Sequence, residues 1–372
     1  MQFKDVIGQQ NIKEKLIHGI QKNKVSHAQL FSGDLGYGTL GLSIAYAQYV
    51  LCLEKKESDS CGTCSSCLKI NELQHPDLHF SFPTVQIESK TSNPFLSHWR
   101  EQIKKNSYFT LLDWTQAIDI KGRQPIISVF ESAEIQRKLS LKSYEGGYKI
   151  TIIWMAEQMN SHCSNKILKI LEEPTSKTIF ILVSQDSENL LDTIKSRCQM
   201  LHLNRVDNAS LKLHLKTKYH LDQKQSESIA SFSEGNIIKA EELINLDEQE
   251  GSLCDNFIGL MRSSYKKNVL EMMNWAEGMA QVGKERQKMF LIYCSHMLRQ
   301  CIIKNYGNAE KVKLSESELS FLKKFSPFIN GNNIREFMKS IDDAYYQLDR
   351  NANPKILFTL MCFQSMRFLH KA

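Results

Sequence analysis

The chain has 372 residues, of which 42% are hydrophobic and 24% charged; this length and balance exclude a disordered, a collagen-like or a bare coiled-coil protein and predict two to three folded domains. The formal net charge of +6 is unevenly distributed: residues 251–372 sum to +7, residues 1–200 to +2 and residues 201–250 to −3. A surplus of this size is common on a solvated surface and can also attract nucleic acid or an acidic partner. No window approaches the roughly 18 consecutive apolar residues of a membrane helix, and the start lacks the layout of a signal peptide. We expect a cytoplasmic protein that does not contact a membrane.

The first 205 residues alternate short apolar runs with helix-patterned sequence. Strands are predicted at residues 28–32, 125–129, 148–154 and 178–184. The apolar run 40–53 follows a glycine cluster and predicts the first crossover helix, and residues 160–172, stopped by Pro174, predict another. This alternation of strand and helix predicts an α/β domain with a parallel sheet over residues 1–205.

The rest of the chain has helical patterning. Three short helices, at residues 206–218, 223–232 and 236–245, predict a small helical domain over 206–246. Long amphipathic runs then predict an all-helical domain over 247–372, with helices at residues 253–265, 268–280, 285–305, 315–325, 334–351 and 354–370. Within the first domain, residues 81–124 are treated as an aromatic-rich insertion with helix around 93–105, and no chemistry is assigned to them.

A glycine loop follows the first predicted strand and precedes the first predicted helix. Gly33, Gly36 and Gly38 lie in the context of a G-x-x-x-x-G-K-[ST] phosphate loop, although a glycine turn between strand and helix is also a common structural device. Thr39 stands where a lysine would meet the β and γ phosphates, and Leu40 stands where a hydroxyl would ligate Mg²⁺. The pattern therefore indicates a vestigial loop.

The strand predicted at residues 148–154 shows a second loss. An ATPase of this layout would end this strand with an acidic pair that organises Mg²⁺ and the attacking water, but the chain has Trp154 and Met155 there. Only Glu157, two positions on, is acidic. We predict no ATP hydrolysis by this chain and no tight binding of nucleotide.

One arginine follows the last predicted strand in the triplet Ser196-Arg197-Cys198. An exposed arginine is often a solubility residue or half of a weak ion pair. In a chain that has lost its own phosphate-handling residues, a positioned guanidinium can instead serve a neighbour's nucleotide as an arginine finger in trans. Arg197 is the candidate for that role.

Four of the ten cysteines cluster within sixteen residues in the pattern C-x8-C-x2-C-x2-C: Cys52, Cys61, Cys64 and Cys67. Four thiolates with no open position predict a structural tetrahedral Zn²⁺ site over residues 52–67. Zinc is favoured over an iron–sulfur cluster because the bacterial cluster pattern places a further cysteine at position 71, which is asparagine here. His75 and His79 stay unassigned, since the cysteines already fill the shell.

Several motifs together resemble one family. They are Val6-Ile-Gly-Gln9, His27-Ala-Gln-Leu-Phe31 before the glycine loop, the four-cysteine module, the run from Asn165 through Glu172-Glu173 to Pro174, and Ser196-Arg197-Cys198. With them, nearly the whole chain resembles the delta-prime subunits of bacterial DNA polymerase III clamp loaders, in the AAA+ superfamily. The chain departs from the family pattern in two places. Trp154 and Met155 go beyond the loss of acidic residues expected of the family, and the insertion 81–124 is longer and more aromatic than usual.

The resemblance implies an AAA+ α/β domain, a small helical domain and a helical collar through which subunits form a hetero-pentameric ring. It implies a non-hydrolysing accessory subunit of the polymerase holoenzyme that helps to load the sliding clamp on primer-template DNA. Arg197 would reach the ATP of the adjacent subunit, and the four cysteines would bind zinc. The sensor arginine of ATP-using relatives would fall near Ile238, so it is missing.

Two other functions stay open at this point. An active AAA+ ATPase of another kind is opposed by the neutral residues at positions 39, 40, 154 and 155. A stand-alone zinc-containing nucleic-acid-binding protein with an AAA+-like fold would be favoured by DNA binding of the isolated chain that falls steeply with salt.

Overall fold

The computed structural model describes residues 1–85, 89–118, 124–221, 223–247, 253–307, 314 and 316–371. The chain divides into two compact units. The first comprises Met1–Leu211 with Gly235–Ile238, and the second comprises Lys212–Glu234 with Lys239–Ala372. The division into three domains at residues 205 and 246 stays a prediction.

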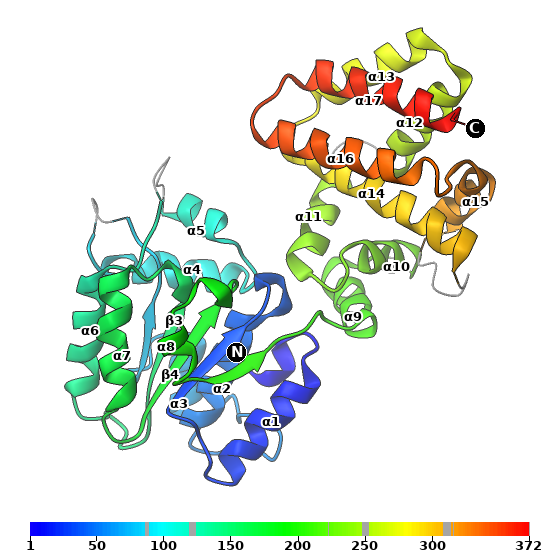
Figure 1. Ribbon diagram of the computed structural model, residues 1–372. Helices are drawn as coiled ribbons and strands as arrows, with labels where there is room; N and C mark the ends of the chain where they lie inside the picture. The colour runs from blue at the N-terminus through cyan, green and yellow to red at the C-terminus, as the bar shows by residue number, and fades with distance from the viewer. Residues whose placement is uncertain are drawn as a thin grey trace. The chain divides into compact units, whose positions relative to one another are not determined.

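The first unit is built on a five-stranded sheet in the order β2-β3-β4-β1-β5. The strands are β1 (Ala28–Ser32), β2 (Leu78–Ser81), β3 (Lys149–Trp154), β4 (Thr178–Ser184) and β5 (Gln199–His202). Every pair is parallel, and each connection between successive strands contains helix, as the crossover of a parallel pair requires. The predicted parallel α/β fold is therefore confirmed (Figure 1).

One strand prediction is wrong and two strands were missed. Residues 125–129 form only isolated bridges, from Ile126 to Thr84 and from Ile127 to Met159, before Ser128 caps the next helix. The missed strands, β2 and β5, each have four residues. Three of the four residues of β5 are exposed at the edge of the sheet, so the strand lacks the apolar run that marks β1 and β4.

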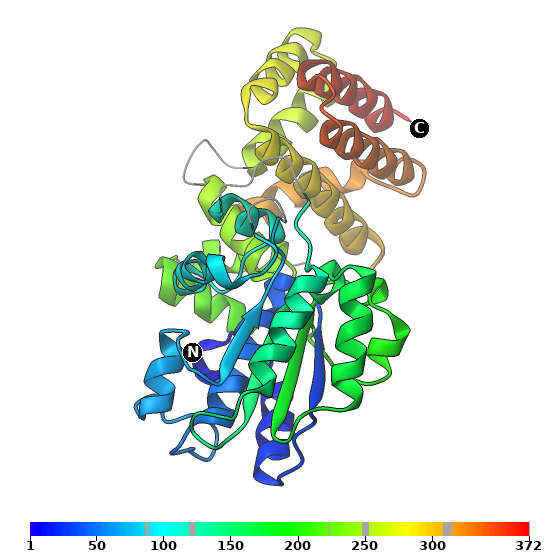
Figure 2. The same cartoon turned by 90° about the vertical axis from the view of Figure 1, so that its left-hand side faces the viewer.

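Helices cover both faces of this sheet, as Figures 1 and 2 show. The helices of the unit are α1 (Gln10–Gln21), α2 (Thr39–Leu51), α3 (Ser65–Asn71), α4 (Leu96–Lys105), α5 (Leu111–Ala117), α6 (Val129–Ser140), α7 (Ser161–Glu172) and α8 (Asp192–Lys195). Alternate strand residues face opposite ways: Phe180 and Leu182 pack with α6, α7 and α8, whereas Ile181 and Val183 pack with α1, α2 and α4. The glycine loop and the predicted α2 and α7 crossovers thus lie in one packed framework.

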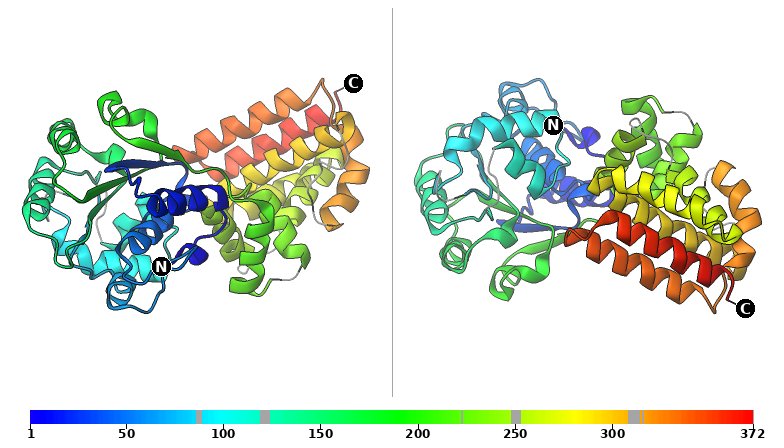
Figure 3. Two further views of the ribbon diagram at one scale, coloured as in Figure 1. Left: turned by 90° about the horizontal axis from the view of Figure 1, so that it is seen from below. Right: turned by 90° about the horizontal axis from the view of Figure 1, so that it is seen from above.

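The helices predicted for the rest of the chain are confirmed. They are α9 (Asn208–Tyr219), α10 (Gln223–Phe232), α11 (Ile237–Asp247), α12 (Leu253–Lys266), α13 (Val269–Gln281), α14 (Lys284–Tyr306), α15 (Glu316–Phe325), α16 (Ile334–Asp349) and α17 (Pro354–Leu369). In the second unit α17 packs against α12, α13 and α16, and Figure 3 shows α16 and α17 running side by side. In the part of the chain that the structure describes, no helix combines the length and the apolar character needed to span a membrane.

Candidate functional site

The glycine loop adopts a tight turn between β1 and α2. Gly33 donates its N–H to the carbonyl of Ser184 at 3.1 Å, and a 3₁₀ turn, η2 (Leu35–Tyr37), follows. Gly38 then has a φ of +89°, a left-handed conformation that favours glycine, and caps α2. The loop therefore retains the turn geometry that the glycine spacing predicts.

Side chains of the chain itself fill the space beside this loop. The N–H of Gly36 donates to the Asp34 carboxylate at 2.9 Å, and the amide Nδ2 of Asn236 donates to the same oxygen at 2.8 Å. Asn236 is buried, and a methyl group at Gly36 would lie only 1.9 Å from its Oδ1 atom. A backbone donor that would face phosphate in a working loop is thus already satisfied by a carboxylate.

Tyr108 covers the other end of the loop. Its Cε1 atom and its hydroxyl lie 3.2 Å from the position that a methyl group at Gly38 would take, and the hydroxyl accepts the N–H of Ile7 at 3.2 Å. Thr39 and Leu40, which stand where the sequence pattern predicts the loss of a lysine and of a Mg²⁺ ligand, are buried at 0% and 3% exposure. The predicted vestigial loop is therefore closed to solvent at the positions where its chemistry would lie.

Trp154, the last residue of β3, is likewise covered by side chains of the chain itself. It is 1% exposed, and its ring centroid lies 5.2 Å from that of Trp99 and 5.0 Å from that of Phe109. Trp99 also packs at right angles to Trp114, with centroids 5.1 Å apart. Aromatic residues of the insertion, for which no chemistry is predicted, thus form a cluster that covers Trp154. The signal was the tryptophan at a position where an acidic residue is expected, together with the six aromatic residues of the insertion.

Glu157 is held by the turn that follows β4. Its Oε1 accepts the N–H groups of Gln185 and Asp186 at 3.0 and 3.3 Å, while its Oε2 is buried. Burial raises the pKa of this carboxyl above its ordinary value. The remaining acidic side chain is therefore engaged in capping a backbone turn.

Arg197 lies at the surface of the first unit, with 36% of its side chain exposed. Its Nη2 forms an ion pair with Glu172 at 2.6 Å, and its Nη1 donates to the carbonyl of Thr193 at 2.9 Å. The neighbouring Ser196 hydroxyl lies 3.4 Å from Nη1. Burial raises the pKa of the Cys198 thiol to about 11, so this thiol is protonated at neutral pH. The guanidinium is thus oriented by the helix end yet still accessible.

The register of the sheet separates Arg197 from the glycine loop. Gln199, two residues after Arg197, pairs with Gln29 near the start of β1, whereas Gly33 follows the last residue of β1. A five-residue strand spans about 16 Å. Arg197 therefore lies at the amino edge of the sheet and the loop at the carboxyl edge, so the guanidinium cannot serve its own chain's loop.

The four predicted cysteine ligands come together at the far end of α2. The Sγ of Cys52 lies 3.6 Å from that of Cys61 and 4.0 Å from that of Cys64, and the Sγ atoms of Cys61 and Cys67 are 3.8 Å apart. All four sulfurs lie within 4.8 Å of one another. A tetrahedral ion with metal–sulfur bonds of about 2.3 Å separates its sulfur ligands by about 3.8 Å. The arrangement therefore fits a tetrahedral metal ion such as zinc.

Backbone N–H groups donate to two of these sulfurs, those of Cys52 and Cys61. Cys61 Sγ accepts the N–H of Thr63 at 3.4 Å and that of Cys64 at 3.2 Å, and these bonds lower the pKa of the Cys61 thiol to about 6. Burial raises the pKa of Cys52 and Cys67. The cluster is held by two helices, because Cys52 caps the end of α2 and Cys67 lies in α3.

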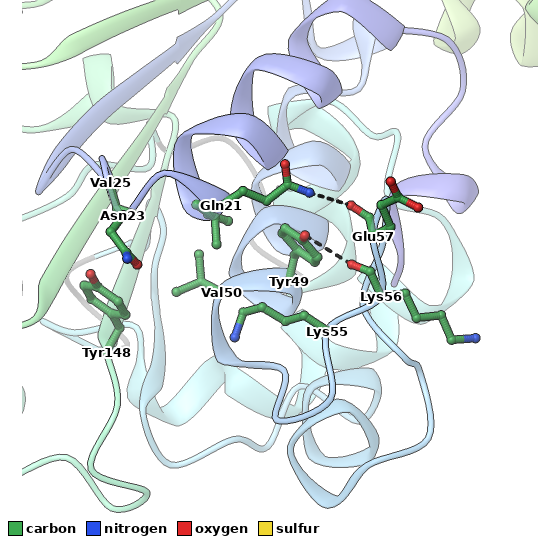
Figure 4. Close-up of a pocket in the computed structure, with 10 residues that line it drawn as sticks. Gln21, Asn23, Val25, Tyr49, Val50, Lys55, Lys56, Glu57 and Tyr148 are labelled. Atoms are coloured by element: carbon green, nitrogen blue, oxygen red, sulfur yellow. Dashed lines mark hydrogen bonds between the residues drawn. The ribbon is translucent and has the colours of Figure 1, made fainter.

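A cavity of about 400 Å³ beside this module is shown in Figure 4. Gln21, from the end of α1, donates through Nε2 to the carbonyl of Glu57 at 2.9 Å, and the Tyr49 hydroxyl of α2 donates to the carbonyl of Lys56 at 3.2 Å. Lys55 Nζ donates to the carbonyl of Cys52 at 2.7 Å. These bonds attach the loop between Cys52 and Cys61 to the two helices.

The two unassigned histidines lie outside the cysteine cluster. His75 is buried, its Nδ1 accepts the N–H of Asp77 at 3.1 Å, and its Nε2 faces Glu145 at 3.3 Å. Burial lowers the pKa of His79 to about 4, with the positive charge of Lys138 adding to the effect. Among the described residues, the cysteines are the group whose ligand atoms converge on a metal position.

Comparison with known proteins identifies the family. The family described as "DNA polymerase III, delta subunit" matches residues 8–207. The delta' subunit of Bacillus subtilis is 30% identical over 193 residues, which cover 52% of this chain and 46% of the relative. The delta' subunit of Escherichia coli is 28% identical over 190 residues, covering 51% and 46%. The chain thus spans about half the length of these delta' relatives.

Two further similarities extend over more of the chain. The tau subunit of Bacillus subtilis is 23% identical over 397 aligned positions, covering all of this chain and 62% of the relative. Among solved structures, a gamma-subunit-related protein of DNA polymerase III from Thermotoga maritima has a TM-score of 0.41 and 16% identity, and covers 95% of this chain and 99% of that one.

Proposed function

Since the chain belongs to the DNA polymerase III delta-subunit family, we propose that it is a non-hydrolysing, delta-prime-like stator of the clamp loader that donates Arg197 in trans to the ATP site of a neighbouring subunit. The observation that carries the proposal is the contrast between a filled glycine loop and an exposed arginine at the opposite edge of the sheet. An arginine so placed has a phosphate to contact only when another chain supplies it.

The closed loop supports the absence of ATP hydrolysis. Asp34 presents a carboxylate where phosphate charge would have to lie, and like charges in this position repel. Thr39 supplies no cation, Leu40 supplies no ligand for Mg²⁺, and buried Trp154 cannot organise a metal-bound water. The sensor position is an apolar residue as well, because Ile238 packs against the core of the first unit.

The exposed arginine supports a role in a neighbour's reaction. A guanidinium that meets the transferring γ-phosphoryl group stabilises its developing charge and commonly increases the rate by about 10³ to 10⁵. The ion pair with Glu172 is exposed, and such pairs contribute only about 0–1 kcal/mol. A phosphate group can therefore displace the carboxylate at little cost.

The expected partners are the other clamp-loader subunits in a hetero-pentameric ring, assembled through residues 247–372. The sliding clamp and primer-template DNA would be contacted through the assembly. The +7 charge of residues 251–372 would then tune contacts between subunits and share in attracting DNA.

Reconstitution of the loader with Arg197→Ala tests the finger role. Clamp- and DNA-stimulated ATPase should fall by at least about 100-fold, because a finger contributes orders of magnitude. Arg137→Ala is the matched control, since Arg137 is also exposed and also forms an ion pair with a glutamate, Glu134; its ATPase should stay within about twofold of the original. A fall of less than threefold for Arg197→Ala, with the ring assembled, would reject the finger.

We also infer that Cys52, Cys61, Cys64 and Cys67 hold one structural zinc ion. A bound ion would join the end of α2 to α3 and so fix the module. Metal analysis of chelator-free protein should find about one zinc per chain, and Cys64→Ser should remove it. Cys198→Ser, a half-buried cysteine outside the cluster, should retain the metal. Iron in place of zinc, or no metal, would contradict the inference.

A further inference from the structure

A small apolar groove lies in the second unit between the end of α12 and the end of α15. Its volume is about 170 Å³, and its lining comprises Met261, Arg262, Tyr265, Lys266, Phe321, Lys324, Phe325 and Phe328. The rings hold one another in place: Tyr265 and Phe328 are 4.9 Å apart between centroids, and Phe321 and Phe325 are stacked at 5.1 Å. Tyr265 and Phe328 nevertheless stay 49% and 37% exposed. The groove is therefore an apolar surface that faces solvent.

Three cations surround this apolar floor. Arg262 and Lys266 lie one turn apart on α12, and Lys324 comes from the last turn of α15. All three are exposed, and no described acidic side chain forms an ion pair with any of them. Other exposed cations of this unit do have carboxylate partners, such as Lys355 with Glu277 and Lys371 with Glu336. The groove thus combines an apolar centre with a rim of positive charge that forms no ion pair with the described carboxylates.

We propose that this groove binds a short acidic peptide segment of a partner protein, with one large apolar side chain in the groove and flanking carboxylates on Arg262, Lys266 and Lys324. Small-molecule sites usually measure about 300–1,000 Å³, so a groove of this size suits a single side chain. Charge complementarity selects the flanking residues, because carboxylates would neutralise the cationic rim. The proposal does not depend on the arginine-finger function.

Single-stranded DNA is the other ligand that combines apolar surface with negative charge, and the ring geometry disfavours it. Bases bind by stacking on open aromatic faces. Here one face of Tyr265 is stacked on His370 at 5.4 Å and tilted by 19°, the ring of Phe325 is buried at 7% exposure, and Phe321 is stacked on Phe325. Because one face of Tyr265 is already stacked and Phe325 is buried, the groove suits an inserted aliphatic or aromatic side chain better than a stacked base.

The test uses the full chain and a fluorescein-labelled peptide, Gly-Asp-Asp-Phe-Asp-Asp-Gly, in fluorescence anisotropy at low salt. We expect a dissociation constant below about 100 µM. A peptide with asparagine at every aspartate position and a peptide with serine in place of phenylalanine should each bind at least about tenfold more weakly. A dT15 oligonucleotide is measured in parallel.

Protein variants locate the binding. The double variant Lys266→Glu, Lys324→Glu should lower the affinity for the acidic peptide at least about tenfold. The control Lys323→Glu, Lys339→Glu changes two exposed lysines outside the lining and should alter the affinity less than about twofold. Phe328→Ala removes a ring that is already 37% exposed, so the circular dichroism spectrum should be unchanged. The affinity for the acidic peptide should nevertheless fall.

Three results would overturn the proposal. They are no peptide binding up to about 500 µM, equal loss in the control lysine pair, and binding of dT15 but not of the peptide. The last result would assign the groove to nucleic acid. None of the three bears on Arg197, so failure here leaves the proposed function standing.

Discussion

At the carboxyl edge of the sheet the chain fills the space beside its glycine loop, whereas at the amino edge it leaves Arg197 exposed. The loop is covered by Asn236 and Tyr108, which come from distant parts of the sequence. Arg197 instead is oriented by its own helix end, through the carbonyl of Thr193, and by Glu172 of α7. The loop is closed by side chains from distant parts of the sequence, whereas Arg197 is held by its own helix end and by Glu172 and stays accessible.

The difference shows how the backbone groups and the space of a buried glycine loop are satisfied by the chain itself. A glycine loop without its ligand leaves backbone donors and space that a protein interior does not tolerate. Here a carboxylate satisfies the Gly36 N–H, the Asn236 amide packs beside it, and the rings of the insertion cover Trp154. If the chain does not bind nucleotide, as we propose, these side chains contribute by filling the space beside the loop, in addition to the neutral residues Thr39 and Leu40. An exposed arginine needs no such compensation, because water solvates it.

The largest effect in this comparison is expected from Gly36→Ala. The added methyl group would lie 1.9 Å from Oδ1 of Asn236, so the filled loop must shift, at a cost of about 2–3 kcal/mol. In an Asn236→Ala background the same substitution should cost less than about 1 kcal/mol. Urea unfolding followed by tryptophan fluorescence measures this cycle, since Trp99, Trp114 and Trp154 all lie in the first unit.

Gly278→Ala serves as the control for this cycle. Gly278 lies in α13, and a methyl group there has nothing within 4 Å, so alanine should stabilise that helix by about 0.5–1 kcal/mol. If Gly36→Ala cost the same with and without the Asn236 side chain, the two residues would not be coupled. The picture of a loop closed by Asn236 would then be wrong.

Arg197→Lys tests whether positive charge alone is enough at the amino edge of the sheet. Lysine keeps the positive charge but lacks the planar fork that contacts phosphate through two parallel hydrogen bonds. In the reconstituted loader we expect stimulated ATPase to fall about tenfold, less than for Arg197→Ala. Full activity of the lysine variant would show that charge alone acts at this edge, and a loss as large as that of alanine would show that guanidinium geometry supplies the whole effect.

Much of the fold could be predicted from the sequence because its signals are local. β1 and β4 are continuous buried apolar runs, and α7 begins at a side-chain cap, Asn160, and ends just before Pro174. β2 and β5 were missed because each has only four residues, too few to show a clear hydrophobic pattern, and β5 is in addition largely exposed. The run 125–129 is apolar for another reason, since Ile127 is buried next to α6 and α7 without joining the sheet.

In the candidate site, too, features that are contiguous in sequence could be predicted, whereas contacts between distant residues could not. The glycine loop, the cysteine spacing and the Ser-Arg-Cys triplet are contiguous in sequence, and the structure places the four cysteine sulfurs together as predicted. Asn236 lies 202 residues from Asp34, and Tyr108 lies 101 residues from Ile7, so no local pattern indicates that either closes the loop. The partnership of Glu172 with Arg197 was hidden for the same reason, although both residues belong to motifs that the sequence singles out.

The smallest effect concerns Glu134, the partner of the control arginine. The hydrogen bond from Arg137, with help from Asn93, lowers the pKa of Glu134 to about 2. Because the folded value lies below the unfolded value of 4.5, this group stabilises the fold above pH 4.5 and loses that contribution as the pH falls toward 2. Glu134→Gln should therefore cost less than about 1 kcal/mol at pH 7, as expected for a pair with an exposed partner. Urea unfolding at pH 7 and pH 3 should show this difference shrinking at the lower pH, while stimulated ATPase stays unchanged. A constant difference at both pH values would mean that shape, not charge, explains it, and a change in ATPase would remove Arg137 as a control for Arg197.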